Sequence, residues 1–380
     1  MKAYILCFII SITFTYIAEL KIKKNKKRIG IFFLILALFT ICIIAGLRDR
    51  TVGIDVSNYP LTIFKLYVEQ GYSFIQVERV THIEPLFSII ILISSIFKNF
   101  NITLFLIEFC CALPIFIYAY NKREKFSITF LIFIFLTTMY AKSFNLIRQF
   151  IAISWIVLSI YYFENKKYKK ALFAYIIAIL FHYSAVICIV AYFIIYILEN
   201  YKNRENKRNW MIFIILIAIV FTLLFTVGLN SISKFLPDKY AAYIGSQYNI
   251  SSFKISSLLK KLLWVVFSAS IVCYYRKKDD MVYSEQLVYL MLLFIDIILY
   301  FMSLKVGTFG RLGYYFLYIA YFGMIPKIRD IFKQKCFISF VIISLLLVLW
   351  YNMTVVNWQA DETYPYSSDV CDFLNENYSK

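Results

Sequence analysis

Long apolar runs separated by short polar stretches repeat along the whole chain. The apolar residues are continuous rather than alternating, and many runs approach the roughly 20 residues with which an α-helix crosses a bilayer. The predicted membrane segments are Ala3–Leu20, Ile29–Leu47, Pro85–Phe97, Ile102–Tyr120, Ser127–Tyr140, Leu146–Phe163, Ala171–Leu198, Met211–Gly228, Leu258–Tyr275, Gln286–Leu304, Leu312–Ile325 and Phe337–Val356. The pattern predicts an all-α polytopic membrane helical bundle with about 10–14 segments, built as a single integral membrane domain over residues 1–380.

Three polar stretches interrupt this pattern. Residues 48–84 and 229–257 are predicted to be outer loops, and residues 357–380 an outer polar tail. The first apolar run has no small-residue cleavage site, so we expect a retained helix. The basic cluster Lys21–Arg28 follows it and favours an outer N-terminus, because basic loops stay on the cytoplasmic side.

Composition agrees with a membrane protein and changes how the charge is interpreted. Hydrophobic residues make up 62% and charged residues 16%, yet the formal net charge is +18. The basic residues gather between apolar runs, which is the distribution of cytoplasmic loops rather than of a nucleic-acid-binding surface. The clusters are Lys21–Arg28, Lys122–Lys125, Lys166–Lys170, Lys202–Arg208, Arg276–Lys278 and Lys327–Lys335. We therefore expect membrane lipids, and no nucleic acid, as partners.

The basic clusters also constrain the topology. Counting every run as one span would place Lys122–Lys125 and Lys166–Lys170 outside, against the positive-inside bias. Both clusters stay inside if Pro85–Tyr120 makes one net crossing and Ala171–Leu198 is a hairpin bent at His182. We favour this second topology, in which four cationic or titratable residues approach the outer face: Arg48, Arg148, His182 and Arg311.

The first outer loop opens with the sequence GLRDRTVGIDVSNYP. It places five chemically capable residues just beyond a helix end: Arg48, Asp49, Arg50, Asp55 and Tyr59. A guanidinium group binds phosphate through two parallel hydrogen bonds and stays charged, so this loop is a candidate phosphate site. The alternative is an interfacial cap, in which the arginines reach lipid headgroups and pair with the aspartates.

Arg148 and His182 are polar residues inside strongly apolar sequence. An arginine at the centre of a span costs about 3 kcal/mol on insertion scales, so Arg148 is expected to face a cavity and a partner. His182 is a candidate proton acceptor, because histidine titrates near neutral pH. The alternatives are a helix-end anchor for Arg148 and a buried neutral histidine for His182. Gln149 is a candidate neutral donor, and His82 is expected to be solvated.

Several other residues carry weaker signals. Glu84 precedes a proline that suits a helix start, and Arg311 and Tyr314 lie in a glycine-punctuated turn. Glu108 and Asp296 lie inside apolar runs and are expected to be interhelical hydrogen-bonding groups or members of buried pairs. Two distant histidines, no acidic triad and no CxxC pair among eight cysteines predict no metal site.

Together these elements resemble the EpsG family of membrane polysaccharide polymerases, which is related to the Wzy-type O-antigen and capsule polymerases. The shared elements follow in order: Gly46-Leu47-Arg48, Gly53-Ile54-Asp55-Val56-Ser57-Asn58-Tyr59, Glu84-Pro85-Leu86-Phe87, Ile147-Arg148-Gln149 with Ala152, Phe181-His182-Tyr183-Ser184-Ala185, Arg311–Tyr315 and Tyr364–Tyr366. The resemblance covers most of the chain. The second arginine in Arg48-Asp49-Arg50 leaves open which of the two aligns with the family pattern.

The resemblance implies a multi-span, GT-C-like glycosyltransferase of the bacterial cytoplasmic membrane whose active site faces outward. A growing glycan on undecaprenyl pyrophosphate would be transferred to the acceptor hydroxyl of a new lipid-linked repeat unit, without a metal or other cofactor. The undecaprenyl-pyrophosphate-linked oligosaccharide and membrane lipids are the expected partners, together with a chain-length regulator protein.

Transfer from a pyrophosphate requires the departing negative charge to be stabilised, which is a task for arginines when no metal is present. The expected catalytic residues are Arg48, Asp55, Arg148 and His182. The expected substrate-binding residues are Arg50, Tyr59, Glu84, Gln149, Ser184, Arg311 and Tyr314. For the acceptor proton, His182 is the first candidate, and Asp55 or Glu84 is its rival.

Two other functions fit the same residues. One is a flippase or exporter of the lipid-linked oligosaccharide, which is not an enzyme, and the other is an O-antigen-ligase-type transferase. A transporter would be expected to carry paired inverted repeats, and the sequence has no such symmetry. We therefore favour the polymerase.

Overall fold

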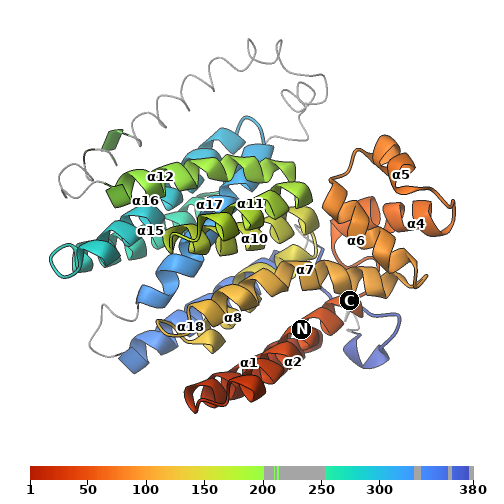
Figure 1. Cartoon of the computed structure of the whole chain (residues 1–380), viewed down its shortest axis with the longest axis horizontal. Coiled ribbons are helices and arrows are strands. Elements are labelled where there is room, and N and C mark those ends of the chain that lie inside the picture. The colour runs from red at the N-terminus through yellow and green to blue at the C-terminus, as the bar shows by residue number, and fades with distance from the viewer. Residues whose placement is uncertain (201–208, 210–211, 214–252, 329–334, 358–361, 376–380) are drawn as a thin grey trace, which may run out of the picture. The chain divides into compact units, whose positions relative to one another are not determined.

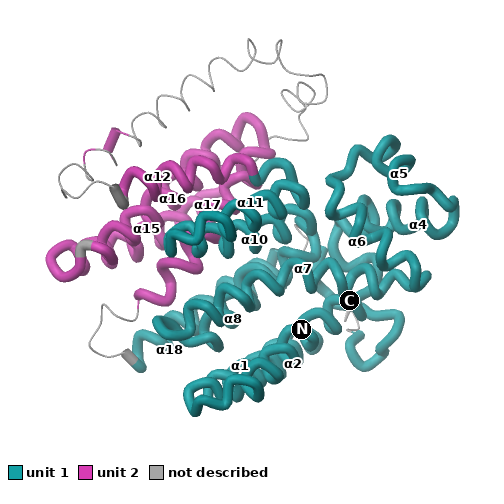
Figure 2. The backbone as a smooth tube through the Cα atoms, in the orientation of Figure 1, with its two compact units in different colours: residues 1–185, 336–380 teal, residues 186–335 magenta. Residues whose placement is uncertain are grey.

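The computed structural model describes residues 1–200, 209, 212–213, 253–328, 335–357 and 362–375. Within these ranges every regular element is a helix, which confirms the all-α prediction. The chain forms two compact units, coloured separately in Figure 2: residues 1–185 with 336–380, and residues 186–335. The prediction of a single membrane domain is not tested by this division and stays a prediction.

Unit 1 contains most of the described chain. Its helices are α1 (Lys2–Lys23), α2 (Lys27–Gly46), α3 (Ile54–Val56), α4 (Thr62–Val68), α5 (Phe74–Thr81), α6 (Pro85–Ser95), α7 (Phe100–Asn121), α8 (Ile128–Phe135), α9 (Ala141–Ser143), α10 (Ile147–Glu164), α11 (Tyr168–Phe181) and α18 (Lys335–Tyr351). The long helices pack in the order α1, α2, α7, α10 and α11. Helices α4, α5 and α6 gather around the start of α7 (Figure 1).

Local sequence signals explain where the unit 1 helices begin. Asn99 caps α7 by accepting a hydrogen bond from the backbone N–H of Asn101, and Ser127 caps α8 in the same way. Glu19 of α1 also accepts hydrogen bonds from the side chains of Ser127 and Thr129. The carboxylate thus ties the start of α8 to α1.

Unit 2 is built around α16 (Asp280–Ser303), which packs against α12 (Ile189–Asn200), α15 (Ile255–Tyr275) and α17 (Thr308–Ile328). Asp296 of α16 is 1% exposed and forms an ion pair with Lys261 of α15, at 2.5 and 2.6 Å. A side chain at Gly313 would collide with Asp296, so the glycine lets α17 approach the pair. The expectation of a buried pair at Asp296 is confirmed.

The helix lengths identify a multi-pass membrane protein. Six described helices are long and apolar enough to cross a bilayer. Helix α6 has 11 residues, so it is about 16 Å long, well short of the roughly 30 Å hydrocarbon core. This agrees with the expectation that Pro85–Phe97 is too short to span. The predicted segment Met211–Gly228, apart from residues 212–213, and residues 229–252 of the predicted loop 229–257 lie outside the described residues.

The apolar run Ala171–Leu198 is broken where His182 stands. Helix α11 ends at Phe181, and His182 is extended, with φ −158° and ψ 113°. A 3-10 turn, Tyr183–Cys188, then leads to α12. The predicted break at His182 is confirmed. The predicted hairpin and the sidedness of the membrane topology stay predictions.

The predicted outer loop 48–84 is more ordered than a polar loop. It contains α3, a π-helical turn at Ser57–Leu61, α4 and α5. The polar tail also folds back onto the beginning of this loop. The backbone N–H of Asp49 donates to the carbonyl of Ser367 at 2.8 Å, and that of Gly53 donates to the carbonyl of Glu362 at 2.8 Å. The tail therefore packs against the beginning of the loop.

Gly53 is where this loop most needs the absence of a side chain. Its φ is +95°, and a Cβ atom would lie 2.2 Å from the carbonyl oxygen of Phe144. Gly53→Ala is expected to destabilise the folded protein by about 2 kcal/mol or more, from strain and from the backbone clash. Gly71→Ala is the matched control, because Gly71 also has a positive φ, +66°, but open space around it. Thermal unfolding in detergent measures both, and equal losses would contradict the assigned clash.

Candidate functional site

The candidate site is centred on Glu84, which lies immediately before α6. Pro85 occupies the first helical position, where its missing N–H costs nothing, and it holds Glu84 extended at φ −66° and ψ 140°. The carboxylate does not cap its own helix. Glu84 is 4% exposed, and both of its oxygens bind side chains from other segments.

Arg148 and His182 both contact the Glu84 carboxylate. Arg148, in the first turn of α10, donates from Nη1 to Glu84 Oε2. His182 Nδ1 lies 2.7 Å from Glu84 Oε1. Arg148 and His182, the two polar residues predicted inside apolar sequence, are therefore joined by a third residue, Glu84. The partner predicted for Arg148 is present.

Tyr59 completes the cluster from the predicted outer loop, residues 48–84. The Arg148 guanidinium carbon lies 4.2 Å from the centre of the Tyr59 ring, a cation–π contact. The side chains of Arg148 and His182 are 17% and 26% exposed. Both can therefore be reached from outside the protein, whereas the carboxylate between them is covered.

Electrostatics keeps Glu84 ionised. Burial alone would raise its pKa, but the hydrogen bond from His182 and the charge of Arg148 outweigh burial and lower the pKa to about 2. An anionic acceptor at Nδ1 favours the tautomer in which Nδ1 carries the hydrogen. The other ring nitrogen of a neutral His182, Nε2, is then available to accept a proton. Glu84 thus orients the imidazole ring of His182 through Nδ1.

Arg48 lies elsewhere in unit 1 and is almost fully buried, at 1% exposure. Its Nη1 donates to the carbonyl of Ala45 at 3.0 Å, and its guanidinium lies 4.0 Å above the ring of Phe144. Arg50 is exposed, with its guanidinium 5.8 Å from the ring of Phe100. Of these two arginines, only Arg50 presents its side chain at the surface.

The remaining predicted residues are placed separately. Asp55 is half-buried in α3, Gln149 is buried beside Arg148, and Ser184 is half-buried in the 3-10 turn after His182. Arg311 is exposed and Tyr314 half-buried in α17. Both belong to unit 2, so their part in the site stays a prediction. The expectation that His82 is solvated is confirmed, since it is exposed.

The tail supplies residues that the sequence reasoning did not place. Tyr366 is fully buried and donates from its hydroxyl to the carbonyl of Ile44 at 2.5 Å. Tyr4 donates to the carbonyl of Thr363 at 2.5 Å, and the rings of Tyr4 and Tyr366 meet edge to face. The only signal for this contact was the aromatic Tyr364–Tyr366 element in an otherwise polar segment.

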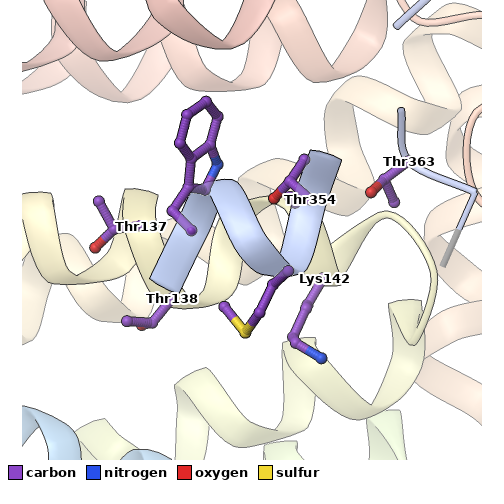
Figure 3. Close-up of a pocket in the computed structure, with 8 residues that line it drawn as sticks. Thr137, Thr138, Lys142, Thr354 and Thr363 are labelled. Atoms are coloured by element: carbon purple, nitrogen blue, oxygen red, sulfur yellow. The ribbon is translucent and has the colours of Figure 1, made fainter. Parts of the chain in front are cut away.

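A small pocket lies apart from the Glu84 cluster (Figure 3). It is bounded by a π-helical turn after α8, by the end of α18 and by the tail, and hydroxyl groups line much of it. Its lining residues are Thr137, Thr138, Ala141, Lys142, Trp350, Met353, Thr354 and Thr363. None is a predicted site residue, so we base the candidate site on the charged contacts and not on this hollow. No described group of three or more His, Cys, Asp or Glu could hold a metal ion.

Comparison with known proteins adds one finding to this geometry. The family model described as the EpsG family matches residues 30–368, which include Tyr59, Glu84, Arg148 and His182. No curated protein and no solved structure matches the chain.

The lowered pKa of Glu84 predicts a pH dependence. A carboxyl group whose pKa falls from 4.5 to about 2 on folding stabilises the protein above about pH 4.5, and that contribution is lost as the pH falls toward 2. Glu84→Gln should remove this part of the acid sensitivity, as measured by thermal unfolding in detergent at decreasing pH. Glu69→Gln, at an exposed position of the same loop, is the control. An unchanged acid profile in Glu84→Gln would contradict the assignment.

Proposed function

The chain belongs to the EpsG family, a Wzy-like polysaccharide polymerase family, and we propose that it joins lipid-linked oligosaccharide repeat units at the outer face of the bacterial cytoplasmic membrane. In this reaction the bond between the first sugar carbon of a growing glycan and undecaprenyl pyrophosphate breaks. A bond from that carbon to a hydroxyl oxygen of the next lipid-linked unit forms. The observation that carries the proposal is the contact of Arg148 and His182 with one carboxylate.

Arg148 is suited to stabilise the leaving pyrophosphate. The pyrophosphate departs with the electron pair of the broken bond, so negative charge develops on its bridging oxygen. A guanidinium group has five N–H donors, and the contact of Arg148 with Glu84 goes through Nη1. Tyr59 supports the face of the guanidinium group, which restricts its orientation. Arg50, exposed at the start of the same loop, is a second candidate for phosphate binding.

His182 is suited to take the proton of the acceptor hydroxyl. Its Nδ1 is held by Glu84 at 2.7 Å, which leaves Nε2 for the substrate. As Nε2 takes the proton, the nearby carboxylate stabilises the imidazolium that forms. Glu84, which was a rival for the base, is thereby assigned to orienting both catalytic side chains. Asp55 remains an alternative base.

The Glu84–His182 pair also distinguishes the competing functions. A flippase for the same lipid-linked oligosaccharide would need cationic groups to hold the pyrophosphate, but it would need no base positioned for a sugar hydroxyl. An ordered carboxylate–histidine pair therefore supports a transferase, of the polymerase or the ligase type. The proposed partners are the lipid-linked oligosaccharide, membrane lipids at the basic clusters and a chain-length regulator protein.

Replacing Arg148 by lysine tests the leaving-group role. Lysine keeps the charge but not the guanidinium fork, so Arg148→Lys is expected to lower polymer formation by about 100-fold while the protein reaches the membrane normally. The measurement compares polymer and membrane protein levels in cells. Arg79→Lys, at an exposed arginine of α5, should have no effect. Normal long-chain polymer in Arg148→Lys would end this assignment.

Replacing His182 tests the proton acceptor. His182→Ala is expected to lower the rate by about 100-fold or more and to leave single repeat units on the lipid carrier. His82→Ala removes the other histidine of the chain, which is exposed, and should leave the polymer unchanged. Chain length is measured on isolated polymer, and unchanged chain length in His182→Ala would assign the base to another residue, with Asp55 the first to test.

A further inference from the structure

A second pair of opposite charges is buried in unit 1, outside the Glu84 cluster. Arg48 is 1% exposed, and Glu108 of α7 is fully buried. Burial lowers the pKa of Arg48, and the charge of Glu108 is the largest influence that opposes this change. A buried charge without a counter-charge is strongly unfavourable.

The two side chains do not form a direct ion pair. Within the described residues, Nε and Nη2 of Arg48 and Oε1 of Glu108 have no hydrogen-bond partner. The Arg48 guanidinium lies over the ring of Phe144, and that ring in turn contacts the rings of Tyr4 and Tyr140.

Both members of the pair contact the same turn. The Arg48 guanidinium stacks on the ring of Phe144, and Glu108 Oε2 accepts a hydrogen bond from the hydroxyl of Ser143 at 2.9 Å. This turn ends α9 and leads directly into α10, whose first turn carries Arg148. Arg48 and Glu108 therefore both contact the turn that leads to Arg148.

Arg48 also begins the loop that reaches Arg148 from the other direction. In this loop, Gly53 packs directly on the carbonyl of Phe144. The chain then continues through α3 to Tyr59, whose ring lies against Arg148. The loop therefore contacts this segment at three points: Arg48 and Gly53 lie against Phe144, and Tyr59 lies against Arg148.

We propose that Arg48 and Glu108 form a buried charge pair that positions Arg148 and Tyr59, and that Arg48 does not contact the substrate. This inference rests on the proposed function for the role of Arg148, but not for the pairing itself. It reassigns Arg48, which the sequence grouped with the catalytic arginines, to a positioning role. It also adds Glu108 to the residues on which the site depends.

The test is a double-variant cycle on the full-length protein. Glu108→Gln keeps the acceptor for Ser143 but leaves the Arg48 charge without a counter-charge. Arg48→Met removes the cation, and the remaining carboxyl group can become neutral by taking a proton, which a guanidinium cannot do. We expect Glu108→Gln to lower polymer formation about tenfold or more, and Arg48→Met to have a smaller effect.

The double variant Arg48→Met/Glu108→Gln is expected to recover both the unfolding temperature and polymer formation, to within about threefold of the unaltered protein. Arg48→Met combined with Asp296→Asn is the mismatched control and should show no recovery. A folded double variant without polymer would overturn the proposal, since Arg48 would then serve the reaction itself. A double variant as unstable as Glu108→Gln would overturn the pairing. Unfolding is measured on purified protein, so this result holds whatever reaction the protein catalyses.

Discussion

The carboxylate of Glu84 is the point at which three distant parts of the sequence meet. Glu84 ends the loop 48–84, and its carboxylate accepts a hydrogen bond from Arg148 at the start of α10 and binds His182 where α11 stops. A buried carboxylate would normally lose its charge, yet the two cationic or titratable partners lower its pKa to about 2. The charge that they stabilise in turn fixes their own orientation. Without Glu84, an arginine and a histidine in apolar surroundings would have no counter-charge.

Further contacts within unit 1 support the segments that carry Arg148 and Tyr59. The tail covers the beginning of the loop 48–84 through two backbone hydrogen bonds, and Gly53 allows that loop to lie on Phe144. Phe144 and Ser143 contact the buried Arg48 and Glu108. A chain of contacts therefore runs from the tail to the helix turn that carries Arg148. A substitution that strains these contacts or removes one of their charges is expected to affect the proposed reaction, even though the substituted residue does not contact the substrate.

The sequence predicted the fold class and much of the site, because continuous apolar runs and isolated polar residues inside them are strong signals. Arg148 and His182 stand out as such breaks, whereas Glu84 is marked only by the proline that follows it. The predicted break at His182 coincides with the end of α11. The contact of Glu84 with both Arg148 and His182 was not predictable, because nothing in the sequence spacing of the three residues indicates it. The burial of Arg48 depends on the return of a tail more than 300 residues away in the chain, as in the bond from Tyr366 to Ile44. Such long-range contacts leave no local pattern.

We propose that this protein joins lipid-linked repeat units after they have reached the outer face of the membrane. Analysis of lipid-linked saccharides in cells that lack the protein, with a membrane-impermeant probe added from outside, tests this order of events. Single repeat units on the lipid carrier that the probe reaches are the expected result, with long polymer again when the chain is restored. Repeat units accessible only from the cytoplasmic side would contradict the proposal and would indicate a translocation function.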